Sequence, residues 1–276
     1  MKIFALVKGT VRELASKAVL YVLAGISTFI LIVAALAIGA SSSDQGMTIT
    51  FFGNPIGTPV PRETLSTMAG ALEASLAGGL FFGVVVFGLF GTAGVIPDAL
   101  EKGTVDIYLS KPIARWQLLA GKYLGSVAVI FLNIVYFIGA IWLVLGIKAG
   151  VWNTHFLLSA LLMTYVFACL YAIVTFLGVV SRNMAIAIIG GFLYLFFIAN
   201  PLEGREAGLY LLSGSGVYRG ILDGLYYLLP QIPAMEAGAM RIVAGEGTTY
   251  VPFLQSFLSA GTLLGGAAWI LYKRDF

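Results

Sequence analysis

Residues 96–115 read Ile-Pro-Asp-Ala-Leu-Glu-Lys-Gly-Thr-Val-Asp-Ile-Tyr-Leu-Ser-Lys-Pro-Ile-Ala-Arg, and this polar stretch separates two long apolar runs. From Asp98 to Lys122 seven residues are charged, whereas the flanking runs 75–97 and 123–147 contain no charged residue. A compact charged loop between two apolar runs is a place where a soluble partner can bind a membrane protein. The sequence thus divides into membrane helices and a candidate contact surface.

Composition identifies the class of protein. Hydrophobic residues occupy 59% of the 276 positions and charged residues 11%, whereas about a quarter of the residues in a soluble domain are charged. A chain with so few charges cannot cover a water-facing surface, so the sequence predicts an integral membrane protein. The single cysteine, Cys169, excludes an intramolecular disulfide, and a net charge of +3 does not indicate nucleic-acid binding.

Six uncharged apolar runs have the length of membrane helices. A helix crosses the hydrocarbon core with roughly 17–25 residues, and only helices suit such runs because lipid cannot pair backbone amides. We therefore predict an all-α integral membrane protein with a single transmembrane domain over residues 1–276. The predicted spans are 18–40, 75–97, 123–147, 156–180, 184–200 and 253–272.

The distribution of Lys and Arg predicts the orientation. With the N-terminus inside, 11 of the 16 basic residues lie in inner segments and 5 lie in outer loops. The positive-inside rule favours this arrangement. We therefore expect a multi-pass protein of the cytoplasmic (inner) membrane, with both termini and the loop after the second run in the cytoplasm.

Residues 2–17 form an amphipathic pattern before the first run. Apolar residues recur at helical spacing from Phe4 to Leu14, with basic residues on the other faces. We predict an interfacial helix on the inner leaflet, with Lys8 and Arg12 anchoring it near anionic headgroups. The alternative is the charged start of a signal peptide, but the apolar run that follows is too long for one.

Two outer segments are predicted to have structure of their own. Residues 207–229 are apolar, but Arg219 and Asp223 would lie near the middle of a span, where each charge costs roughly 2.5–3.5 kcal/mol. We predict instead a helical re-entrant or surface segment, with Arg219 and Asp223 paired at i,i+4, and a second short helix over 234–244. Residues 47–52 alternate weakly like a strand, and the glycines and prolines after them break the pattern.

The chain lacks the motifs of nucleotide, metal and nucleophile sites. It has no Gly-x-x-x-x-Gly-Lys-Ser/Thr run, a single histidine (His155) and no Cys/His cluster. We therefore predict no catalytic residue, no bound metal and no enzymatic activity. Asn133 is a candidate pathway residue, although Asn at such a position more often joins helices, and Gly79 and Gly83 would allow close packing within the chain or between two copies.

The charged loop itself predicts a short helix. Asp98 is suited to the start of a helix over 98–102, and Gly103 is suited to its end. Such a helix would lie parallel to the membrane and expose Glu101 and Lys102. A solvated loop capped by headgroups is the alternative, and residue types alone do not separate the two.

The same loop resembles a hallmark of a known family. The pattern is Glu101-x-Gly103-Thr104-x-x-x-x-Leu109-Ser110-Lys111-Pro112-Ile113-x-Arg115, followed by Gly121-Lys122-x-x-Gly125. It resembles the loop of the permease (transmembrane) subunits of type-2 ABC exporters, the ABC-2 family. Within that family the chain is most similar to permeases of the copper-enzyme maturation and nitrous-oxide-reductase accessory group.

This resemblance implies a permease that forms a homodimer, or a heterodimer with a related permease, above a separate cytoplasmic ATPase subunit that binds ATP and Mg²⁺. The function implied is export of a substrate, driven by ATP hydrolysis in that partner. The loop would be the coupling helix that contacts the ATPase, while Arg115 and Lys122 would anchor it at the headgroups. The implied contact residues are Asp98, Glu101, Lys102, Gly103, Thr104 and, in the turn between the fourth and fifth runs, Arg182.

Two other functions stay open on the residues. The large outer loops also fit a non-transporting membrane subunit that relays ATPase-driven motion to an extracytoplasmic partner. An intramembrane enzyme would need a nucleophile and a base within the spans, and the sequence shows no such pair.

Overall fold

The computed structural model describes residues 2–16, 19–43, 46–60, 78–79, 83, 85–101, 103, 113–150 and 152–274. Four of its helices are long and apolar enough to cross a membrane. They are Arg115–Lys148, Thr154–Ser181, Met184–Glu203 and Val251–Lys273, at the positions of the last four predicted spans. The protein is therefore a mostly helical, multi-pass membrane protein, as the composition predicts.

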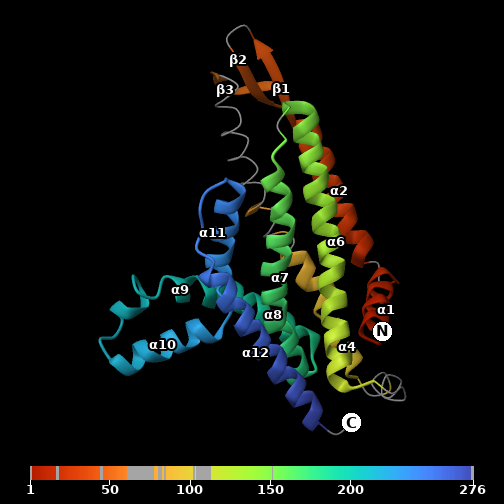
Figure 1. The fold of residues 1–276 in the computed structure, drawn as a ribbon, viewed down its shortest axis with the longest axis vertical. Helices are drawn as coiled ribbons and strands as arrows, with labels where there is room; N and C mark the ends of the chain where they lie inside the picture. The colour runs from red at the N-terminus through yellow and green to blue at the C-terminus, as the bar shows by residue number, and fades with distance from the viewer. Residues whose placement is uncertain are drawn as a thin grey trace.

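Helix α7 (Thr154–Ser181) is the centre of the bundle, and α6 (Arg115–Ala149) runs beside it (Figure 1). α7 packs against α6, α8, α11 and α12, and its Phe167 and Tyr171 are completely buried. α6 contains 35 residues. At 1.5 Å per residue it is about 52 Å long, which exceeds the roughly 30 Å of a hydrocarbon core. α6 is therefore longer than it needs to be to cross the apolar layer.

The remaining two long apolar segments complete the bundle. α8 (Met184–Leu193) continues through a π-helical segment, η1 (Tyr194–Ala199), into α9 (Asn200–Glu203). α12 (Val251–Lys273) crosses α7 and ends near the C-terminus (Figure 1). Because these helices are apolar on most faces, many of their large side chains remain exposed on the isolated chain, as lipid-facing side chains would be.

The first two predicted spans are described less completely. α1 (Lys2–Ser16) is followed by α2 (Val19–Ala37), an apolar helix that ends three residues earlier than predicted. The second predicted span is an apolar helix over Val85–Ala99, and most of its first part lies outside the described residues. A total of six spans therefore stays a prediction.

A small antiparallel sheet corrects the all-α prediction. β1 (Ile38–Ser43), β2 (Gly46–Phe51) and β3 (Asn54–Val60) form it in the order β1-β2-β3, with Phe51 opposite Asn54. Phe52 and Gly53 both have positive φ, 50° and 81°, which is the geometry of a tight two-residue hairpin turn. Of the Gly and Pro residues expected to break the strand, Gly53 lies in the turn that reverses it. Pro55 and Pro59 lie within β3, which tolerates proline because it is at the sheet edge.

The segment before the last span forms a helical module beside the bundle. It contains η2 (Leu209–Leu211), α10 (Gly216–Leu228) and α11 (Ile232–Val243), and α10 extends sideways from the bundle (Figure 1). Helices thus form within both predicted segments, over 216–228 and 232–243, and α10, at 13 residues, is too short to span a membrane.

The predicted pairing of Arg219 with Asp223 is wrong. Asp223 instead accepts a hydrogen bond from Arg205 Nε at 2.7 Å and one from the Tyr210 hydroxyl at 2.6 Å. Arg219 lies over the Tyr210 ring. Arg205 is only 7% exposed, and a buried guanidinium needs a carboxylate partner. It therefore pairs with Asp223, which the i,i+4 spacing had predicted to pair with Arg219.

Candidate partner interface at the end that holds the termini

Helix α4 (Val95–Ala99) begins earlier than predicted, so the prediction of a helix over 98–102 is wrong. Gly94 caps it, and the Asp98 amide donates to the Gly94 carbonyl at 2.9 Å, which places Asp98 inside the helix. Val95, Ile96 and Ala99 are buried. Burial of these apolar side chains against α6 and α7 outweighs the start signal that Asp98 provides.

The chain turns outward directly after α4. Leu100 is 4% exposed, whereas Glu101 and Gly103 are exposed. Gly103 has a φ of +89°, a conformation that a side chain disfavours, so glycine at this position permits the turn. Lys102 and Thr104, the other two predicted contact residues of the loop, lie outside the described residues.

The turn between α7 and α8 lies against α4. Arg182 ends α7 with a φ of +52°, and Asn183 caps α8 by accepting from the Ala185 amide at 2.8 Å. A β-carbon added to Gly178, one turn before Arg182, would lie 3.3 Å from Pro97 Cδ. The structure therefore brings α4, which leads into the loop, next to the end of α7, which leads into the turn. The sequence proposed the loop and the turn as separate contacts. We call Asp98, Glu101, Gly103 and Arg182 the terminal surface.

Helix α1 packs directly on α6 next to this surface. A β-carbon at Gly125 would lie 2.5 Å from Thr10 Cβ, and one at Gly121 would overlap Leu6. The glycine pair thus allows α1 and α6 to approach closely. Lys8 and Arg12 are exposed on the other side of α1, where headgroup contact remains a prediction.

The structure corrects the predicted headgroup role of Lys122. This residue is 3% exposed and forms an ion pair with Glu13 of α1. Close packing of α1 at Gly121 and Gly125 covers Lys122, and a covered ammonium group needs a partner. The sequence offers one signal for this pair, which is a single glutamate among the basic residues of the N-terminal segment.

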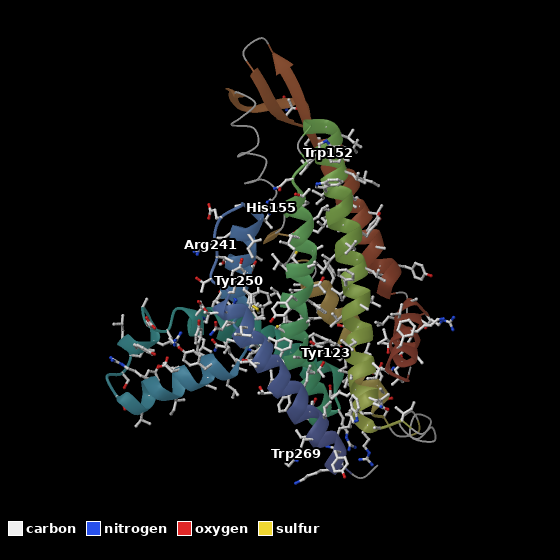
Figure 2. All side chains as sticks on the ribbon, in the orientation of Figure 1. Tyr123, Trp152, His155, Arg241, Tyr250 and Trp269 are labelled. Atoms are coloured by element: carbon white, nitrogen blue, oxygen red, sulfur yellow. The ribbon has the colours of Figure 1, made fainter. Side chains whose placement is uncertain are left out.

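A buried polar network continues from Lys122 into the bundle. Ser126 Oγ donates to the Lys122 carbonyl at 3.0 Å, and the Tyr171 hydroxyl donates to the Thr92 carbonyl at 2.9 Å and lies 3.2 Å from Ser126 Oγ. Tyr123 stacks on Tyr171 and lies between α6 and α7 (Figure 2). These contacts connect α6, α7 and the helix that leads into α4, and sequence reasoning missed them.

Two arginines join the helix ends at this side of the bundle. Arg115 Nη1 donates to the carbonyls of Leu271 at 3.0 Å and Tyr272 at 3.3 Å in α12. Arg274 donates to the carbonyls of Val179 at 2.5 Å and Val180 at 2.9 Å in α7. Arginine satisfies the unpaired carbonyls of a helix C-terminus. Arg115 thus ties α6 to α12, a role that the sequence did not predict.

The α7–α8 turn lies close to the end of α12, because Arg274 donates to carbonyls at the end of α7. Burial and the charge of Arg182 lower the pKa of Arg274, although an arginine so affected remains protonated. Arg182 and Arg274 therefore add positive charge at the terminal surface, opposite in sign to Asp98 and Glu101.

The other predicted residues lie away from the terminal surface. Asn133 Oδ1 accepts a hydrogen bond from Ser27 at 3.2 Å, which joins α6 to α2, as Asn commonly does between membrane helices. No described atom lies within 4 Å of a β-carbon added to Gly79 or Gly83, whereas Gly78 contacts Met240 of α11. Within the described part of the chain, Gly79 and Gly83 therefore pack against no neighbouring element.

No group of His, Cys, Asp and Glu residues that could hold a metal occurs in the described ranges.

Residues 27–271 match a family model described as ABC-2 family transporter protein. The comparison with curated proteins finds no match for the chain.

Proposed function

Because the chain belongs to the ABC-2 family of transporter proteins, we propose that it is a permease subunit whose substrate export is driven by a separate cytoplasmic ATPase subunit. ABC-2 permeases typically pair with such a subunit and are not themselves catalytic. The observation that carries the proposal for this chain is the contact of Pro97 with Gly178, which joins α4 to the α7–α8 turn in one surface.

The ATPase would bind the terminal surface, together with Lys102 and Thr104 of the same loop. Glu101 is exposed and Asp98 is partly buried, and Arg182 offers a charge of the opposite sign on the same surface. Mixed charges of this kind favour a specific orientation of a bound partner. ATP and Mg²⁺ would be held by the ATPase, and both termini of the permease would lie in the cytoplasm.

Movement of the ATPase would enter the bundle through α4. α4 packs on α6 and α7, and its preceding helix is hydrogen-bonded to Tyr171 of α7. α6 in turn is joined to α1 by the ion pair between Lys122 and Glu13. A push at Glu101 therefore reaches two spanning helices and α1 through direct contacts. A second permease copy, identical or related, would complete the pathway.

Site-specific photo-crosslinking tests this assignment. A photoreactive residue at position 101 should yield a product with a subunit that carries a P-loop, whereas the same residue at Glu246, which is exposed in the outer segment, should not. In the same cells, Glu101→Lys should reduce ATP-dependent function without reducing membrane insertion. A P-loop product at position 246 and none at position 101 would contradict the proposed surface.

A relay of motion to an extracytoplasmic partner is a second candidate, and one observation supports it. α2 runs directly into β1, and Ser27 and Thr28 of α2 are hydrogen-bonded to Asn133 and Tyr136 of α6. Motion of α6 would therefore reach the sheet. ATP-dependent substrate accumulation in liposomes containing permease and ATPase would favour export, whereas ATP-dependent labelling changes in the sheet without accumulation would favour the relay.

A further inference from the structure

A groove opens between the start of α6 and the end of α12. It is lined by Ile113, Ala114, Arg115, Trp116, Ala268, Trp269 and Tyr272, and it encloses about 700 Å³. Arg115 holds its two walls together through the carbonyls of Leu271 and Tyr272. Trp269 marks this groove at the end of α12 opposite to the sheet (Figure 2).

The walls of the groove are aromatic and accessible. Trp116 is 54% exposed, Trp269 59% and Tyr272 78%. Trp and Tyr gather at the level of lipid headgroups, where their rings meet both acyl chains and polar groups. α12 has 23 residues, or about 35 Å, slightly more than a core of roughly 30 Å, and its last turn carries Lys273, which suits the headgroup level.

Two basic side chains lie at the described part of this groove. Arg115 lines it, and Lys273 Nζ lies 4.2 Å from the centre of the Trp269 ring. None of the lining residues is acidic. The groove therefore combines apolar rings for acyl chains with cationic groups for a phosphate, which is the chemistry of an anionic phospholipid.

We propose that this groove binds an anionic phospholipid, with the phosphate beside Lys273 and Arg115 and an acyl chain along Trp116 and Trp269. This goes beyond the proposed function, because lipid would bind whether or not an ATPase is present. A lipid in this position would contact both α6 and α12, the two helices that Arg115 connects.

Tryptophan quenching by brominated lipids tests the proposal on the purified full-length chain, reconstituted without any ATPase. The chain has four tryptophans. The double variant W142F/W152F leaves Trp116 and Trp269 as reporters of the groove. The double variant W116F/W269F leaves Trp142 and Trp152 as a matched control near the sheet end, where their rings pack edge to face with centres 4.6 Å apart.

Brominated phosphatidylglycerol should half-quench the groove reporters at a mole fraction at least about fivefold lower than brominated phosphatidylcholine, because each basic residue near anionic lipid contributes a factor of about this size. The control reporters should show no preference. Lys273→Gln should lower the groove preference about fivefold, whereas Lys148→Gln, at the other end of α6, and Lys273→Arg should preserve it.

Equal quenching of the groove reporters by the two lipids would overturn the proposal. An unchanged preference in the Lys273→Gln variant would overturn it as well.

Discussion

Lys122 of α6 and Glu13 of α1 form an ion pair at the contact between the two helices. The Lys122 side chain is 4% exposed and that of Glu13 26%. An ion pair covered to this extent stabilises a structure mainly because neither charge is left alone. α1 is therefore a component of the bundle and moves with α6.

Lys122→Ala should lower the free energy of unfolding by about 2–4 kcal/mol. This is less than the roughly 3–5 kcal/mol lost when a fully buried pair is broken, because Glu13 retains some contact with water. The double variant Glu13→Gln/Lys122→Met should recover most of the loss, since it removes both charges. Reversible unfolding in detergent measures these differences. Lys8→Ala, at an exposed site on the same helix, should change stability by no more than about 0.5 kcal/mol. Equal losses in the single and double variants would contradict the pairing.

Gly125→Leu should displace α1 from α6, because even a β-carbon at this position would lie 2.5 Å from Thr10 Cβ. The measurement is maleimide labelling of a cysteine at position 14, where the native leucine is completely buried, in a Cys169→Ala background. Labelling should rise at least about tenfold, as expected when a local contact worth about 1.4 kcal/mol is lost. Gly139→Leu, on the same helix with open space around it, should leave labelling unchanged.

Gly178→Leu should push Pro97 and α4 away from the α7–α8 turn, because the position leaves 3.3 Å between an added β-carbon and Pro97 Cδ. Photo-crosslinking from position 101 to the ATPase should fall by half or more. Gly265→Leu, a glycine of α12 with nothing within 4 Å, is the matched control and should not alter the yield. A normal yield in the Gly178→Leu variant would show that the partner does not depend on the position of α4.

Arg274→Gln should loosen the end of α7, because it removes the donors to the Val179 and Val180 carbonyls. Each lost bond to a charged group costs roughly 1.5–3 kcal/mol when buried, and less at this partly exposed site. Hydrogen exchange should accelerate at residues 181–186. Arg241→Gln, in the outer module, should leave exchange in this segment unchanged, and faster exchange in that control would indicate a global effect.

The Asp223 cluster predicts a pH dependence in the outer module. Hydrogen bonds from Tyr210 and Arg205 lower the pKa of Asp223 below its ordinary value. A carboxylate whose folded pKa is lowered contributes stability above its unfolded pKa, near 4, and loses this contribution as pH falls through the folded value. Corrected for intrinsic rates, hydrogen exchange in α10 should therefore accelerate below about pH 4. Asp223→Asn should exchange quickly at pH 6 and show a weaker pH dependence.

The membrane class and the helical spans follow from sequence alone. Lipid cannot hydrogen-bond backbone amides, so a long uncharged run in the bilayer must form a helix. The rejection of residues 207–229 as a span has the same origin. Arg219 and Asp223 are too costly within a bilayer, wherever the rest of the chain lies. The contact of Asn133 with another helix was also anticipated, since an amide in a span needs a nearby partner.

Partners distant in sequence were decided only by the tertiary structure. Nothing local to Lys122 indicates that α1 covers it, and nothing near Arg115 indicates that α12 ends beside it. α4 begins earlier than the sequence predicts, because burial of its apolar side chains against α6 and α7 outweighs a helix cap at Asp98. Local sequence patterns decide whether a segment forms a helix or a strand. Which side chains are buried, which charges pair, and what satisfies the carbonyls at helix ends depend on neighbouring elements that only the packing brings close.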